Sequence, residues 1–163
     1  MADQRPAEQL PRSLGLTVSR IAAEFWDYAE RYYVGRGGKP SREGGHFQAA
    51  MCSLRRLYGG TQAAAFGPLA LKVIQREMIK LGWCRKYVNC QLGRIKQIFR
   101  WAVSQELAPA TISHGLASVE GLREGKTEAR ETGPIKAVAE EHVEATLAHV
   151  SRQVAAMARL AQL

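Results

Sequence analysis

The sequence predicts an all-α protein, a bundle of four to five helices followed by a linker and one or two further helices. Apolar residues recur every three to four positions in each long segment, which is the period of an α-helix. Clusters of glycine and proline separate these segments. No segment shows the strict alternation of a half-buried strand, so we expect helices throughout. With 163 residues the chain has room for one domain and an appendage.

The first two predicted helices follow a lead-in over residues 1–16, which contains prolines and glycine without periodicity and is expected to be flexible. Thr17 can cap the first helix. Its apolar stripe consists of Val18, Ile21, Phe25, Tyr28 and Tyr32. Three glycines and a proline in residues 35–40 predict a loop. The second helix begins at Ser41, and its inward residues are Phe47, Met51 and Leu54.

Three more predicted helices complete a domain over residues 17–120. Pro68 stands at the favoured first position of the third helix, and Gly82 follows its last apolar residue as a C-terminal cap. The fourth helix covers residues 85–107, and a short fifth helix follows Pro109.

The composition changes at residue 121. Residues 121–138 are charged, contain glycine and have almost no large apolar side chains, which predicts an interdomain linker. Residues 139–163 return to the helical pattern. This last segment is too short to bury its apolar face by itself.

The fourth helix has the most distinctive pattern. Its apolar stripe consists of Val88, Leu92, Ile95, Phe99 and Ala102. Between Glu77 and Glu106 the chain has no acidic residue. Gly93 lies in the middle of the cationic side, where glycine weakens a helix by about 1 kcal/mol relative to alanine. A close approach by the backbone of a partner would explain this glycine.

The overall charge favours a polyanionic partner, because the net charge is +8 and the pI about 9.8. We predict double-stranded DNA, contacted by Lys86, Asn89, Gly93, Arg94, Lys96 and Arg100 of the fourth helix and by Arg55 and Arg56 of the second. No apolar run approaches the roughly 18 residues that span a bilayer, and no signal peptide is recognisable, so the expected compartment is the cytoplasm. Three cysteines without CxxC spacing indicate neither a disulfide framework nor a zinc site, and no cofactor is expected.

The fourth helix resembles the last long helix of the core-binding domain in tyrosine recombinases of the phage integrase family. The matching residues are Asn89, Leu92, Ile95, Lys96, Phe99, Trp101, Ala102, Val103 and Leu107. The order of the helices fits the same SAM-like domain, so the resemblance covers roughly residues 17–138. Residues 139–163 are then expected to begin a truncated catalytic domain. The resemblance implies duplex DNA binding by a monomer that can assemble on DNA in the full-length protein.

The catalytic residues of that family have no counterparts in this chain. The family's first arginine lies in a TGxR motif, which is absent. His149 and Arg152 spell HxxR, but they stand before the place of that motif, and we interpret them as a chance match. The tyrosines, which all fall within the helical domain, are Tyr28, Tyr32, Tyr33, Tyr58 and Tyr87. We therefore predict no catalytic residue and no enzymatic activity for the chain as it stands.

Two other functions remain open at the level of the sequence. One is a helical DNA-binding transcriptional regulator, although the turns here are longer than those of a helix-turn-helix motif. The other is a basic helical module that binds an acidic protein. A solvated cationic face without a partner is the simplest alternative for any single helix.

Overall fold

The computed structural model describes residues 15–35, 38, 41–133 and 137–161. Within these residues it contains seven α-helices, a 3-10 turn at Ala63–Ala65 and no β-strand, which confirms the predicted all-α class. The chain divides into two compact units, Met1–Thr132 and Gly133–Leu163. The lead-in predicted for residues 1–16 lies almost wholly outside the described residues.

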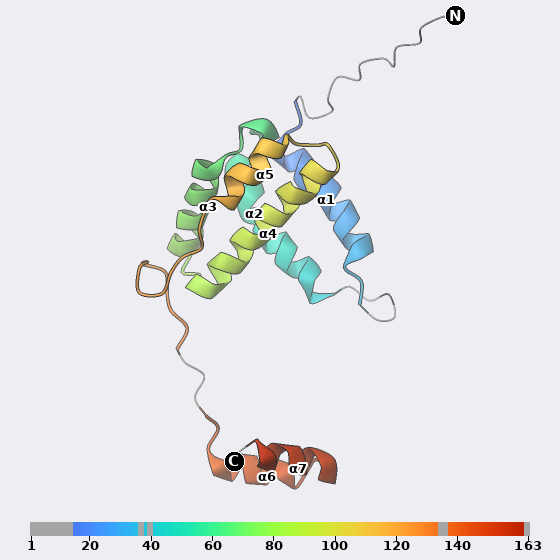
Figure 1. Cartoon of the computed structure of the whole chain (residues 1–163), viewed down its shortest axis with the longest axis vertical. Coiled ribbons are helices and arrows are strands. Elements are labelled where there is room, and N and C mark those ends of the chain that lie inside the picture. The colour runs from blue at the N-terminus through green and yellow to red at the C-terminus, as the bar shows by residue number, and fades with distance from the viewer. Residues whose placement is uncertain (1–14, 36–37, 39–40, 134–136, 162–163) are drawn as a thin grey trace, which may run out of the picture. The chain divides into compact units, whose positions relative to one another are not determined.

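Five helices form the first unit, with α4 running through its middle (Figure 1). They are α1 (Val18–Tyr32), α2 (Arg42–Tyr58), α3 (Pro68–Lys80), α4 (Arg85–Ser104) and α5 (Ala110–Ala117). The central helix α4 packs against each of the other four. Its fully or almost fully buried side chains are Val88, Gln91, Leu92, Ile95, Ile98, Phe99 and Ala102.

Local signals in the sequence place the ends of these helices. The Thr17 hydroxyl accepts a hydrogen bond from the backbone N–H of Arg20 at 3.3 Å, as an N-cap should. Pro68 occupies the first turn of α3. Gly82 ends that helix with φ of +77°, a left-handed conformation that costs glycine little. These boundaries follow from residues within one helical turn.

Aromatic side chains fill the centre of the bundle. Phe99 is fully buried, as predicted, and its ring stacks on that of Phe66 at a centroid distance of 4.7 Å and an interplanar angle of 2°. Phe25 and Phe47 are also buried and lie 4.9 Å apart. The burial of apolar side chains away from water is the main term that stabilises a small helical domain.

The segment after α5 does not leave the bundle where the sequence predicted a linker. Residues 119–131, which we call the strap, lie along α4, and Ala129 is buried. The sequence predicted a linker because this segment is charged and has few large apolar residues. The strap is held instead by polar contacts, which hydrophobic periodicity cannot reveal.

The second unit contains α6 (Glu140–Leu147) and α7 (Arg152–Leu160). Ser151 caps α7 by accepting a hydrogen bond from the N–H of Val154. Neither helix has a buried residue. Across the described parts of both units, no helix is long and apolar enough to cross a membrane.

Candidate nucleic-acid interface

One side of α4 remains open to solvent. Its exposed residues, which we call the open strip, are Lys86, Cys90, Gly93, Gln97, Arg100 and Ser104. They recur at alternating intervals of four and three, so they lie on one side of the helix. The open strip contains no acidic residue. At 1.5 Å per residue it is about 27 Å long.

Two cations and a glycine define the charge and shape of the open strip. Lys86 and Arg100 have no acidic partner among the described residues. They are about 21 Å apart along the helix axis. Gly93 lies midway between them, and a Cβ atom built there would have no neighbour within 4 Å. The middle of the strip is therefore unobstructed.

Arg94 does not belong to the open strip. Its guanidinium donates to both carboxylate oxygens of Glu43 on α2, at 3.0 and 3.2 Å. It also lies 6.0 Å from the centre of the Phe47 ring, and only 15% of its side chain is exposed. Arg94 thus joins α4 to α2, and its charge is already neutralised within the bundle.

Asn89 and Lys96 hold the strap. The Asn89 amide donates to the Leu122 carbonyl at 2.9 Å and accepts from the Leu122 N–H at 2.7 Å. The Lys96 ammonium donates to the Val119 carbonyl. Burial lowers the pKa of Lys96. The sequence predicted these side chains as DNA contacts, but both of them bind the protein's own backbone.

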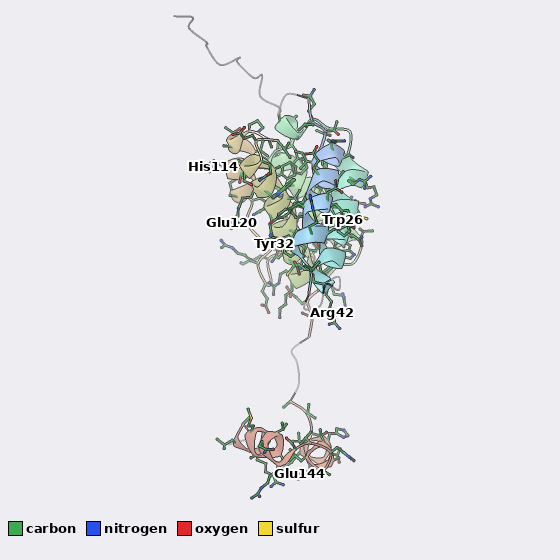
Figure 2. All side chains as sticks on the ribbon, turned by 90° about the vertical axis from the view of Figure 1, so that its right-hand side faces the viewer. Trp26, Tyr32, Arg42, His114, Glu120 and Glu144 are labelled. Atoms are coloured by element: carbon green, nitrogen blue, oxygen red, sulfur yellow. The ribbon has the colours of Figure 1, made fainter. Side chains whose placement is uncertain are left out.

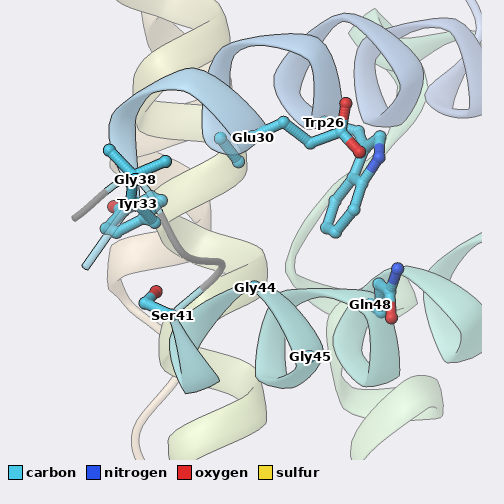
Figure 3. Close-up of a pocket in the computed structure, with 10 residues that line it drawn as sticks. Trp26, Glu30, Tyr33, Gly38, Ser41, Gly44, Gly45 and Gln48 are labelled. Carbon is cyan, nitrogen blue, oxygen red and sulfur yellow. The ribbon is translucent and has the colours of Figure 1, made fainter. Parts of the chain in front are cut away.

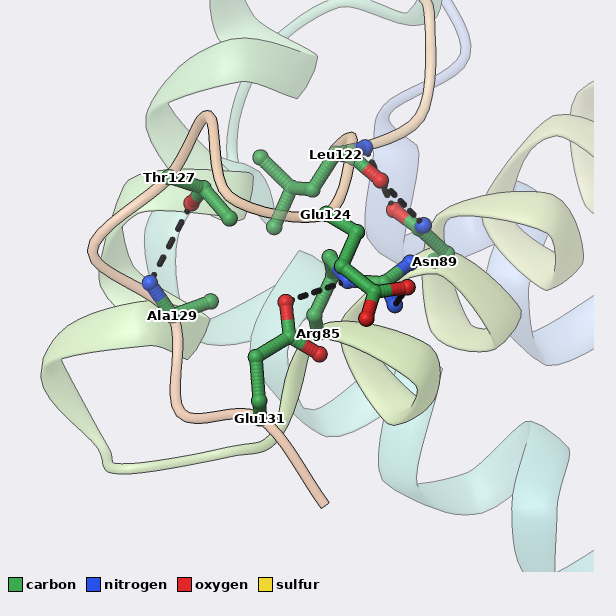
Figure 4. A network of polar contacts seen from close by, with 7 residues as sticks. All are labelled: Arg85, Asn89, Leu122, Glu124, Thr127, Ala129 and Glu131. Carbon is green, nitrogen blue, oxygen red and sulfur yellow. Dashed lines mark hydrogen bonds and ion pairs between the residues drawn. The ribbon is translucent and has the colours of Figure 1, made fainter. Parts of the chain in front are cut away.

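Arg85 forms more hydrogen bonds with the strap than Asn89 or Lys96 does, and sequence reasoning did not select it (Figure 4). Its Nε donates to Glu131 at 2.6 Å and its Nη2 to Glu124 at 3.0 Å. Its backbone N–H donates to the Arg130 carbonyl at 2.9 Å. Only 12% of the side chain is exposed. The hydrogen bond that Arg85 donates to the Glu131 carboxylate is the main cause of its raised pKa.

The two predicted arginines of α2 differ from each other. Arg56 is exposed but pairs with Glu77 on α3 at 3.1 Å. Arg55 has no acidic partner among the described residues and lines a groove of about 400 Å³ with Trp26 and Gln48. Only Arg55 is therefore available to an external anion without breaking an ion pair.

A second exposed cationic row lies on α3, and the predicted contact residues did not include it. Lys72, Arg76 and Lys80 recur at intervals of four, and all three are exposed. Two exposed apolar residues, Leu69 and Val73, lie on the same side of the helix. The spacing of the three cations was visible in the sequence, but their exposure depended on which side of α3 is buried.

The α1–α2 side carries apolar and aromatic surface (Figure 2). Tyr28 stacks between Tyr32 and Trp101 at centroid distances of 5.2 and 5.4 Å. A groove of about 420 Å³ is lined by residues of α1 and of the start of α2, and Figure 3 shows Trp26 over the N-terminal turns of α2. The Ser41 hydroxyl in this groove is buried without a partner in the described structure. The groove is small and mainly apolar.

Comparison of the chain with protein-family models, with curated proteins and with solved structures finds no match. Within the described residues there is also no group of three or more side chains that could hold a metal ion.

Proposed function

We propose that the first unit is a duplex DNA-binding module and that it contacts DNA through the open strip of α4. The observation that carries this proposal is a solvent-facing row about 27 Å long with a free cation near each end and no acid. The chain's surplus of basic residues adds a long-range attraction for a polyanion.

The side chains of the open strip suit a helix lying in a groove. The major groove of B-DNA admits an α-helix. Lys86 and Arg100 would contact phosphates near the two ends of the strip, where long side chains can reach outwards. Cys90 and Gly93 are small, so the helix axis can come close to the duplex between them. Gln97 can form hydrogen bonds with base edges.

The resemblance of α4 to the core-binding helix of tyrosine recombinases supports the same proposal. In that setting the chain would be the DNA-binding part of a site-specific recombinase, without the residues that cut and join strands. We predict that no covalent protein–DNA adduct forms, even with a nicked substrate. An adduct on a denaturing gel would contradict this assignment.

Two substitutions test the interface directly. Arg100→Gln and Lys86→Gln should each weaken duplex binding and reduce the log–log salt slope by about 0.9, because each removes one phosphate contact. Both residues are exposed and lack partners in the described structure, so the unfolding midpoint should stay unchanged. Fluorescence anisotropy over a salt series measures affinity and slope.

The control is Arg159→Gln in α7, which removes the same charge from the second unit. It should change the affinity less than either open-strip variant. If the α4 variants bind duplex DNA with the parent's affinity and slope, α4 is not the interface. Arg55 and the α3 row would then be the next candidates.

A second candidate function is the binding of an acidic protein through α3. The observation that favours it is the combination of Lys72, Arg76 and Lys80 with the exposed Leu69, whose relative exposure is 79%. Charged and apolar groups on one helix face suit a protein surface better than a phosphate backbone. Arg76→Gln should then weaken capture of an acidic partner and leave the salt slope for duplex DNA unchanged.

A further inference from the structure

We propose that Glu124 and Glu131 of the strap act as internal competitors of nucleic-acid phosphate for Arg85, so that the free protein holds α4 in a state of reduced DNA affinity. The inference rests on the proposed function, because it concerns how the α4 interface is regulated. It adds a third α4 cation, Arg85, to the contact surface once the carboxylates have moved away.

The contacts of Arg85 are those that a phosphate would make. A guanidinium presents its N–H groups to two oxygens in a fixed fork, and carboxylate and phosphate both match this geometry. Here two separate carboxylates occupy Nε and Nη2 at 2.6 and 3.0 Å. Arg85 directly precedes Lys86, so its side chain leaves the same turn of α4 about 100° away from the open strip, and a phosphate backbone that follows the duplex past Lys86 comes within reach of this long side chain.

The two carboxylates can leave Arg85 without detaching the strap. The Glu124 side chain is 80% exposed and that of Glu131 38% exposed, so both can turn into solvent. The strap backbone has separate anchors in the Asn89–Leu122 pair and in the bond from Lys96 to Val119. The Arg85 guanidinium is only 12% exposed, but both glutamates reach solvent, so water and salt screen these pairs in part and phosphate at high local density can replace the carboxylates.

The strap also changes the electrostatic potential beside α4. Its acidic residues are Glu120, Glu124, Glu128 and Glu131, and its basic residues are Arg123, Lys126 and Arg130. The strap therefore carries a net charge of −1 next to a helix that contains no acid. Its nearest carboxylates lie at the N-terminal end of the open strip, where they oppose an approaching polyanion.

The test compares two double substitutions in the full chain. Glu124→Gln/Glu131→Gln frees Arg85, whereas Glu120→Gln/Glu128→Gln removes the same two charges from the strap without touching Arg85. The control variant breaks the ion pair between Arg123 and Glu120, but both of those side chains are already 73% exposed. For the first variant we expect duplex DNA affinity to rise roughly three- to tenfold at about 0.1 M salt, with a salt slope steeper by about 0.9. The control variant should keep the parent's slope.

Arg85→Gln provides the second arm. In this background the substitutions at Glu124 and Glu131 should no longer tighten binding, because the cation that they release is absent. Hydrogen exchange of the Leu122 amide reports whether the strap stays in place, since this N–H is bonded to Asn89. We expect its protection to persist in the Glu124→Gln/Glu131→Gln variant.

Three results would overturn the inference: equal slopes for the two double variants, a gain that survives Arg85→Gln, or loss of Leu122 protection together with the gain. The last result would mean that the whole strap, and not the two carboxylates, limits binding. If the parent chain does not bind duplex DNA and the open-strip variants have no effect, the proposed function itself fails. If instead the parent binds duplex DNA and the Glu124→Gln/Glu131→Gln variant binds no more tightly, only the inference about the strap fails.

Discussion

Helices α4 and α7 are both amphipathic, yet they differ completely in burial. Seven residues of α4 are buried between the other helices of the bundle. The apolar row of α7, which contains Val154, Met157 and Leu160, is exposed along its whole length. The same period of about 3.6 residues therefore predicts a helix in both places, but it does not predict whether the apolar side of that helix is buried against other helices.

The two units also differ in charge. In the second unit Lys136, Arg152 and Arg159 balance three glutamates, so the whole net charge of +8 lies in Met1–Thr132. The buried core and the cationic surface thus belong to the same unit. Matched substitutions in the two units should therefore have unequal effects.

The largest expected difference is in the loss of apolar side chains. Phe99→Ala should lower the free energy of unfolding by about 3–5 kcal/mol, because it leaves a cavity beside Phe66. Met157→Ala in α7 should change it by less than about 0.5 kcal/mol, because 72% of that residue is already exposed. Denaturant unfolding followed by circular dichroism measures both. Equal losses would mean that α7 is buried in solution or that Phe99 is not in the core.

A smaller effect of opposite sign is expected at Gln91. This side chain is fully buried, and neither its amide nitrogen nor its carbonyl oxygen has a partner in the described structure. Gln91→Leu should therefore raise the free energy of unfolding by about 1–3 kcal/mol, which is the cost of burying unpaired polar groups.

The matched change in the second unit is Gln153→Leu, at an exposed position of α7. It should leave the unfolding midpoint of the bundle where it is. A destabilised Gln91→Leu variant would show that the Gln91 amide forms hydrogen bonds in solution.

Glycine in the open strip gives a third comparison. Gly93→Ala should stabilise the bundle by about 1 kcal/mol, because the added methyl group meets nothing and alanine favours the helix. Ala156→Gly in α7 should weaken that helix without shifting the midpoint of the bundle. Gly93→Glu adds bulk and negative charge to the open strip, so its effect should appear in duplex affinity. An unchanged affinity for Gly93→Glu would argue against close contact at Gly93.

The smallest expected effect is a dependence on alkaline pH. Burial lowers the pKa of Lys96 below its ordinary 10.5 in the folded protein. Between that lowered pKa and 10.5 the unfolded chain binds the proton more strongly, so the contribution of Lys96 to stability rises with pH. Lys96→Met should remove this rise.

The raised pKa of Tyr33 acts in the opposite direction above pH 10, because the unfolded chain loses that proton first. The informative quantity is therefore the difference between the parent and Lys96→Met in chemical denaturation at a series of pH values. A flat difference would place Lys96 in solvent and remove it as an anchor of the strap.

The sequence by itself determined the helices and the central position of α4. The N-cap at Thr17, the proline at the start of α3 and the left-handed Gly82 depend on neighbours within about one turn, and so does the period of each apolar stripe. The change to a charged composition at residue 121 also indicated that the bundle ends near this point. Because the strap packs on α4, the first unit ends later, at Thr132. The burial of Phe99 followed because it stands at the centre of its stripe.

Only the tertiary structure decided which polar residues of α4 face solvent. Asn89 binds a residue 33 positions away, Arg85 one that is 46 away and Arg94 one that is 51 away. A helical wheel places these side chains near Lys86 and Arg100, but it contains no information on the strap or on the first turn of α2. Hydrogen bonds and ion pairs between distant segments depend on how the chain returns to α4, and periodicity along one helix does not encode that path.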